Sequence, residues 1–370
     1  MIDEKYFYIS ENNSLNNLVN EIKKSPIIGI DTEFSRSETY FPVLSIIQVA
    51  VKIDQQKKIY IIDCMKDLDL SSFLGLIADD NIIKILHSCL QDLQIFFLKL
   101  PLKPQAIVDT QILANFCDYG TNVGYGNLVE KIFGVVIDKK LQRSDWCRRP
   151  LSEKQLQYAS LDVVFLHEIY EKLQKILQEK RRSEFYDEEI ERFIDKALFG
   201  NKDNLIRNFS LRKKNQQFVA ILKKLLLWRE DQARICDIPR QHFLRDEELE
   251  ELAQNREINS QIIAKINETS LQNLKEILNE ENIDEANIGN DYHDVLFLSS
   301  AQKIIFLEAK KIITKIAFEE KIAEQFLLNN HDLKKIISSQ ENLKSILLKI
   351  AGKWRFNLLH QELAKLFNHK

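Results

Sequence analysis

The chain has 370 residues, of which 45% are hydrophobic and 29% charged, and its net charge is −3 with a pI of about 6.2. This composition is typical of a globular chain of two or three domains. The balance of charge excludes a global basic field, so a nucleic acid would have to be held by local basic patches.

The cysteines and the N-terminal residues indicate the cellular compartment of the protein. The five cysteines are odd in number, far apart and without a Cys-X-X-Cys pair. This pattern predicts free thiols in a reducing compartment, and it argues against a disulfide framework or a zinc site. The start is acidic and lacks a signal-peptide profile, and no apolar run is long enough to span a bilayer. We therefore expect a cytoplasmic protein with no membrane partner.

The first 135 residues alternate between two periodicities. Strand patterns occur at residues 6–9, 27–30, 45–52, 58–63 and 82–86. Helical patterns start at Ser14, at Ser71 and after His87, and they continue over residues 107–116 and 127–133. A short connection joins the third and fourth strands, which should therefore pair as a hairpin across residues 52–57. The alternation predicts an α/β domain with a mixed sheet flanked by helices.

After residue 152 the strand signals almost vanish. A long helical run is expected from Ser152 to about residue 180, followed by amphipathic helices alone. The polar stretch 201–208, which follows Gly200, is the expected linker, and residues 287–293 divide the helical remainder into two units. The expected domains are therefore residues 1–200, 201–289 and 290–370.

Two acids follow the buried strand at residues 27–30. Side chains alternate along a strand, so Asp31 and Glu33 should point the same way, with Thr32 pointing the other way. Paired carboxylates repel each other unless a cation lies between them, and an all-oxygen pocket suits Mg²⁺ or Mn²⁺. The pair alone is weak evidence, because such spacing is common at solvated strand ends.

Two further acids and a tyrosine strengthen the pattern. Asp92 lies near the start of a helix that follows a core strand, where the helix dipole alone would also favour an acid. Tyr158 and Asp162 are spaced i,i+4 and share one helical face. Together with the acid pair they could hold two cations about 3.5–4 Å apart around a scissile phosphate. Tyr158 could then aim the attacking water.

Three segments resemble the three motifs of the DEDDy 3′→5′ exonucleases, namely residues 31–34, 87–92 and 158–162. Residues 39–42, 108–110 and 146–152 are also similar to the ribonuclease D family. This resemblance implies a ribonuclease H-like α/β exonuclease domain. It also implies that Asp31, Glu33 and Asp162 hold one metal, that Asp31 and Asp92 serve a second, and that Tyr158 positions the nucleophile.

The helical part extends the resemblance. Residues 218–253 look like an HRDC domain, a helical module shared by helicases and ribonuclease D. Residues 290–370 would then be a second, divergent HRDC-like domain. The sequence has no Gly-X-X-X-X-Gly-Lys-Ser/Thr loop, so energy-driven helicase activity is not supported.

Candidate RNA contacts are concentrated before the third motif. The basic stretch 139–149 contains a tryptophan, and basic side chains beside an aromatic suit single-stranded RNA. The alternative is a solvated loop that Trp146 anchors to the core. Phe34 could pack on the terminal nucleotide or be buried. The full set of candidate RNA contacts is Phe34, Gln48, His87, Arg143, Trp146, Arg148 and Arg149.

The resemblance implies a metal-dependent 3′→5′ exoribonuclease. It would use two divalent cations, Mg²⁺ or Mn²⁺, to trim single-stranded 3′ ends such as those of tRNA precursors, and it would release nucleoside 5′-monophosphates. We expect a monomer. Two alternatives remain open: an exonuclease on the same scaffold that prefers DNA, and a non-catalytic nucleic-acid-binding scaffold.

Overall fold

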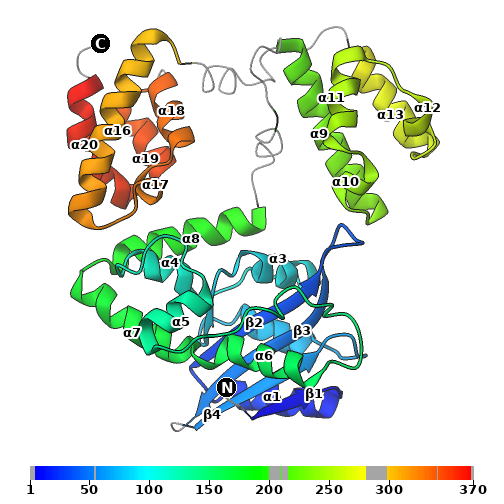
Figure 1. Ribbon diagram of the computed structural model, residues 1–370, viewed down its shortest axis with the longest axis vertical. Helices are drawn as coiled ribbons and strands as arrows, with labels where there is room; N and C mark the ends of the chain where they lie inside the picture. The colour runs from blue at the N-terminus through cyan, green and yellow to red at the C-terminus, as the bar shows by residue number, and fades with distance from the viewer. Residues whose placement is uncertain are drawn as a thin grey trace.

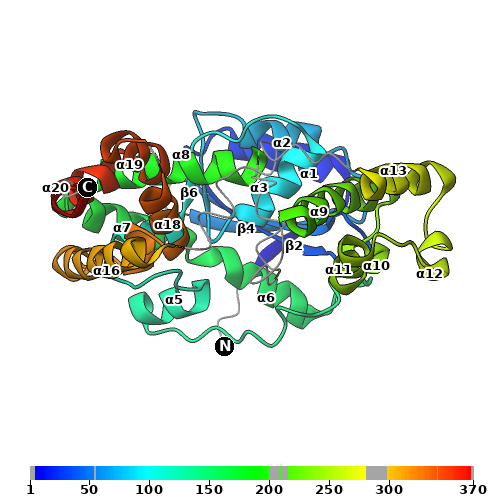
Figure 2. The same cartoon turned by 90° about the horizontal axis from the view of Figure 1, so that it is seen from above.

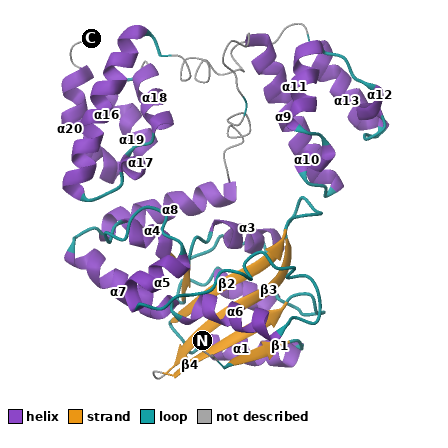
Figure 3. Ribbon diagram, viewed as in Figure 1, coloured by secondary structure: helices purple, strands orange, loops and turns teal. Residues whose placement is uncertain are grey.

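The structure is a computed structural model that describes residues 5–53, 56–199, 209, 216–280, 298–339 and 341–367. An α/β domain carries every described strand, and two all-α units follow it in the chain (Figures 1 and 3). All five cysteines are free, as predicted. Within the described ranges, no helix is both long and apolar enough to cross a membrane.

The α/β domain is built on a six-stranded sheet with the order β1-β4-β3-β2-β5-β6. Strands β2, β3 and β4 run antiparallel, whereas β1, β5 and β6 pair in parallel with their neighbours. The predicted hairpin is confirmed, with Lys52 opposite Lys57. The strands are β1 Tyr6–Ile9, β2 Ile27–Ser35, β3 Val43–Ile53, β4 Gln56–Asp63, β5 Ile83–Leu86 and β6 Ile107–Asp109.

Helices cover both faces of this sheet, which confirms the predicted mixed sheet flanked by helices. Helices α1, α2 and α3 lie on one face, and α6 crosses β2, β3 and β4 on the other (Figure 2). The helices of this domain are α1 Asn12–Ile22, α2 Ser71–Ile77, α3 Leu90–Lys99, α4 Thr110–Asn115, α5 Tyr125–Phe133, α6 Glu153–Val164, α7 Leu166–Glu179 and α8 Ser183–Phe199.

The helical run predicted from Ser152 to about residue 180 is confirmed, although the chain breaks at Phe165 into two helices, α6 and α7. The Tyr125 hydroxyl donates to the Leu161 carbonyl at 2.9 Å and accepts from the Phe165 amide at 3.2 Å. The hydroxyl thus replaces the helical hydrogen bond between the Phe165 amide and the Leu161 carbonyl. A side chain inserted in this way interrupts a helix. Beyond the break, Leu166 packs on Gly29 of β2, where an added Cβ would lie 3.1 Å from its side chain.

The helix predicted over residues 107–116 is partly wrong. Its first three residues form the edge strand β6, and α4 begins only at Thr110. The Asp109 side chain caps α4 by accepting from the amides of Gln111 and Ile112. It also accepts from the amides of Ser88 and Cys89, at 3.1 and 2.8 Å. A buried aspartate therefore ties the turn before α3 to the start of α4.

The two helical units differ in how they meet the α/β domain. The first unit has its own apolar core, and Tyr40 packs against that core. The core of the second unit is continuous with that of the α/β domain, with Phe185 stacked on Trp354 at 5.2 Å. The predicted linker at 201–208 and the division at 287–293 lie outside the described residues.

The first unit consists of α9 Gln216–Cys236, α10 Arg240–Phe243, α11 Asp246–Asn255, α12 Ser260–Ile263 and α13 Glu268–Asn279. The second unit consists of α16 Ser300–Glu320, α17 Glu324–Leu327, α18 Asn330–Ser338, α19 Leu343–Ala351 and α20 Lys353–Phe367. Both units are all-α, as predicted.

Candidate active site

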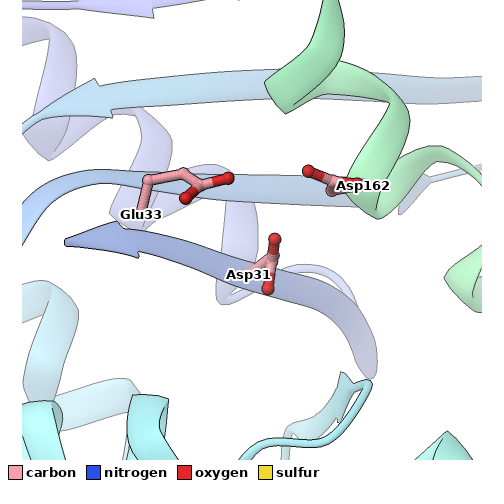
Figure 4. A group of neighbouring side chains, drawn as sticks. All are labelled: Asp31, Glu33 and Asp162. Carbon is pink, nitrogen blue, oxygen red and sulfur yellow. The ribbon is translucent and has the colours of Figure 1, made fainter. Parts of the chain in front are cut away.

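Three carboxylates converge where β2 leaves the core. Asp31 and Glu33 lie on the same side of β2, as the strand periodicity predicts, and Asp162 of α6 faces them (Figure 4). One oxygen from each of the three lies within 4.8 Å of the others. Segments 130 residues apart in the chain thus meet in one oxygen-rich cluster.

The electrostatics of this cluster are unfavourable without a cation. Burial and the charges of Asp162 and Asp92 raise the pKa of Glu33 to about 9. Burial and the same neighbours, with Glu33, also raise the pKa of Asp31, and burial raises that of Asp162. Among the described residues, no lysine or arginine forms an ion pair with any of the three. Three clustered carboxylates without a counter-charge fit a hard divalent cation, which prefers oxygen ligands.

Asp92 lies apart from the three-carboxylate cluster. It is buried in the first turn of α3 and accepts a short hydrogen bond from the Thr32 hydroxyl. Thr32 is the residue of β2 that points away from Asp31 and Glu33, so Asp92 approaches the strand from its other side. Burial raises the pKa of Asp92 to about 6, although the Thr32 hydrogen bond opposes that rise.

Tyr158 lies one helical turn before Asp162. Its ring is nearly buried against Trp146, with centroids 5.9 Å apart, and its hydroxyl interacts with the Asp162 carboxylate. Burial and the charges of Asp162 and Glu33 raise the pKa of Tyr158 well above its usual value. The hydroxyl therefore stays protonated and can hold a water molecule but cannot act as a base.

All five predicted catalytic residues line one cleft of about 540 Å³. Tyr125 also lines the cleft and was not singled out from the sequence, whereas Lys139 and Gln142 come from the basic stretch 139–149. Tyr125 lies there because its hydroxyl splits α6 from α7. Lys139 is the one cation among the described lining residues, and its place against Gly126 depends on loop geometry that sequence periodicity does not encode.

Four of the seven candidate RNA contacts remain accessible. Phe34 and His87 line the cleft, and Arg143 and Arg148 are exposed. Both ring nitrogens of His87 already have protein partners, Thr110 Oγ1 and the Val123 carbonyl, each at 2.9 Å. His87 can therefore offer RNA only its ring surface.

The structure does not support RNA contact by the other three candidates. Gln48 lies on β3 directly opposite Asp31 and has no exposed surface. Trp146 is 3% exposed, which favours the alternative that it anchors the loop to the core. Arg149 is held by the buried Asp63, with its Nη2 2.5 Å from the carboxylate, and donates to the Trp146 carbonyl at 2.6 Å. These side chains support the site from within.

Comparison with known proteins shows which protein families the chain matches. Residues 6–178 match the family model described as 3′-5′ exonuclease, and residues 219–280 match that of the HRDC domain. Ribonuclease D from Shewanella sp. (strain ANA-3) is 32% identical over 369 residues, covering 97% of this chain and 93% of the relative. Ribonuclease D from Bartonella henselae is 28% identical over 372 residues, covering 94% and 87%.

A solved structure shares the whole fold. The crystal structure of Escherichia coli RNase D, described as an exoribonuclease involved in structured RNA processing, matches with a TM-score of 0.79 at 24% identity, and the match covers 99% of both chains. The identity over nearly the full length of the Shewanella relative carries the assignment. The chain belongs to the ribonuclease D family of 3′→5′ exoribonucleases.

Proposed function

We propose that the cleft removes the last nucleotide of single-stranded RNA by two-metal hydrolysis and releases nucleoside 5′-monophosphates. The observation that carries the proposal is the convergence of Asp31, Glu33 and Asp162 within 4.8 Å in an open cleft. The 3′ ends of tRNA precursors are the proposed substrate class, and Mg²⁺ or Mn²⁺ the proposed ions.

The acids divide into two sets around the cleft. Asp31, Glu33 and Asp162 would hold the first ion, while Asp31 and Asp92 would serve the second from opposite sides of β2. A divalent cation supplies a Lewis acid that lowers the pKa of water and stabilises negative charge on phosphate oxygens. Thr32 fixes the Asp92 carboxylate in place through its hydrogen bond.

Tyr158 would orient the attacking water. Its hydroxyl remains protonated, and its ring cannot swing away because Trp146 packs behind it. A positioned donor and acceptor lowers the barrier by fixing the approach of the nucleophile. Arg143, Arg148 and Phe34 would guide the strand toward the acids.

The rest of the chain would serve substrate binding. We propose that residues 1–200 form the exonuclease domain, 201–289 an HRDC domain and 290–370 a second, divergent HRDC-like domain, and that the protein acts as a monomer. Two findings support this division: the HRDC match over residues 219–280 and the separate apolar core of α9–α13.

The test is hydrolysis of end-labelled single-stranded RNA and DNA of equal sequence with Mg²⁺, Mn²⁺ or a chelator. RNA should shorten from its 3′ end, and chelator or the Asp31→Asn variant should stop the reaction. Asp80→Asn, which removes an exposed carboxylate, is the matched control and should cleave normally. Normal cleavage by Asp31→Asn would refute the assigned site, and preferential loss of DNA would favour the DNA-preferring alternative.

A further inference from the structure

Arg36 is a cation at the rim of the acidic cleft. It forms no ion pair with a described residue, although the charge of Asp92 in the cleft acts on it. It follows β2 by one residue, and its guanidinium lies 5.3 Å from the ring centroid of Phe34, which lines the cleft. The side chain is exposed. Across the described part of the chain it forms no hydrogen bond or ion pair. A guanidinium in this state can bind an anionic ligand without breaking a hydrogen bond or an ion pair.

The loop that carries Arg36 is fastened to the first helical unit. The Tyr40 hydroxyl donates to Glu230 of α9, and the Phe41 amide donates to Asp237 Oδ1 at 3.0 Å. Arg240 of α10 donates to the same Glu230 carboxylate at 2.7 Å and lies over the Tyr40 ring, 5.6 Å from its centroid. These contacts fix where the loop stands relative to α9 and α10.

This docking also brings a second guanidinium near the first. Partial desolvation lowers the pKa of Arg36, the charge of Arg240 lowers it further, and the charge of Asp92 opposes both. Glu230 forms an ion pair with Arg240, whereas Arg36 forms none with a described residue. Of the two guanidinium groups, Arg36 is therefore the one available to an anionic ligand.

An RNA strand that enters the cleft first passes the positive charge at the rim and then reaches the negative charge of the acid cluster. The acid cluster repels phosphate until cations are bound, so attraction at the rim must come from the protein's own basic groups. We propose that Arg36 binds a backbone phosphate upstream of the scissile bond, and that Tyr40, Glu230 and Arg240 are positioning residues that hold its loop. This inference rests on the proposed function in that its ligand is RNA.

The geometry favours a phosphate over other ligands of the same charge. A guanidinium presents parallel N–H donors that match two phosphate oxygens, and stacking on an aromatic ring fixes its plane. Because Phe34 both lines the cleft and contacts Arg36, we expect the scissile phosphate at the acid site and the next linkages at Arg36. Lysine cannot reproduce this planar fork, so Arg36→Lys should restore only part of the affinity.

The test compares Arg36→Gln with the wild type on an RNA oligonucleotide and on the p-nitrophenyl ester of thymidine 5′-monophosphate, which has no upstream phosphate. We expect KM for RNA to rise about tenfold with kcat retained, and the ester to respond less than about twofold. Arg234→Gln removes an exposed arginine of α9 that pairs with Asp231 of the same helix, and it is the control for the loss of one positive charge.

Two further readouts separate phosphate binding from a merely structural role. The slope of log K against log salt for RNA binding should fall by about one in Arg36→Gln. Replacing one upstream linkage by a neutral methylphosphonate should weaken binding by the wild type but not by Arg36→Gln. Tyr40→Phe, which removes the hydroxyl bond to Glu230, should raise KM by about threefold and leave the salt slope unchanged.

Each remaining outcome would contradict the inference. An unchanged RNA affinity and salt slope in Arg36→Gln would exclude phosphate binding there. Equal losses of kcat on RNA and on the ester would place Arg36 at the acid site instead. If the wild type hydrolysed neither substrate, the proposed function would fail, yet RNA binding measured without metal would still show whether Arg36→Gln weakens it.

Discussion

Buried carboxylates occur in two contrasting places in the α/β domain. In the cleft, Asp31, Glu33 and Asp162 lie close together, and no described lysine or arginine forms an ion pair with them. At the end of β4, Asp63 is fully buried and accepts from Arg149 and from the Tyr8 hydroxyl, each at 2.5 Å. The first group is short of positive charge, and the second is saturated.

The pKa shifts have opposite signs for this reason. Burial alone would raise the pKa of Asp63, but hydrogen bonds from Arg149 and Tyr8 outweigh it and hold the value below its usual range. In the cleft, burial and like charge act together and raise the pKa of Glu33 to about 9. Paired charge stabilises the fold, whereas unpaired charge is available to a ligand.

The largest expected contrast comes from removing one charge in the cleft. Asp31→Asn takes away a ligand and should lower kcat on RNA by about a thousandfold or more. It also removes repulsion, so the melting temperature of the metal-free protein should not fall. Steady-state kinetics and thermal melts in chelator measure the two effects. A large loss of metal-free stability would mean that Asp31 holds the fold together.

The same chemical change at Asp63 should mainly lower the stability of the fold. Asp63→Asn leaves Arg149 without its counter-charge, and breaking a buried pair from one side costs about 3 kcal/mol or more of unfolding free energy. Denaturant melts at neutral pH measure this cost. Retained stability would show that the hydrogen bonds at this position matter and the charge does not.

The two groups also differ in how far sequence reasoning reaches. The acids of the cleft are local signals, because strand alternation places Asp31 with Glu33 and helical spacing places Tyr158 with Asp162. The partnership of Asp63 with Arg149 joins residues 86 positions apart and carries no periodicity. The sequence therefore predicts RNA contact for Arg149, and the fold assigns it to a buried pair.

The break between α6 and α7 and the strand β6, which the sequence did not predict, have the same origin. The pattern across residues 152–180 is helical throughout, and only the hydroxyl of the distant Tyr125 interrupts it. The three residues of β6 are strand because β5 offers them partners, in spite of a local pattern that continues into a helix. The presence and type of most elements are predictable from local periodicity, whereas breaks, edge strands and the order of the strands in the sheet depend on tertiary contacts.

Tyr158 links the two regions and gives an intermediate effect. Its hydroxyl interacts with Asp162, and its ring packs on Trp146, whose carbonyl accepts from Arg149. Tyr158→Phe keeps the ring and should lower kcat by about 10- to 100-fold with little change in metal affinity or stability. Kinetics and calorimetric metal titration separate these quantities. Lost metal affinity would make Tyr158 a support for Asp162 and not a group that orients water.

The smallest and most diagnostic effect is in the pH dependence of stability without metal. The pKa of Glu33 lies at about 9 in the folded state and near the usual 4.5 of a glutamate in the unfolded state, so the folded state binds the proton more tightly. The contribution of Glu33 to the stability of the fold is complete below about pH 4, and it is lost as pH rises toward about 9. Asp63 has a lowered pKa, so it stabilises the fold at neutral pH. This stabilisation is lost as pH falls into the acidic range.

Thermal melts of the metal-free protein between about pH 5 and pH 9 should therefore show a melting temperature that falls by several degrees. Glu33→Gln should flatten this dependence, and saturating Mg²⁺ should abolish it, because the ion binds the deprotonated carboxylates and gains affinity as pH rises. The stabilisation by Mg²⁺ should then be greater at about pH 8 than at about pH 6. A metal-free melting temperature that rises across this range would mean that some cationic group compensates the cluster, and the cleft would then resemble the saturated pair at Asp63.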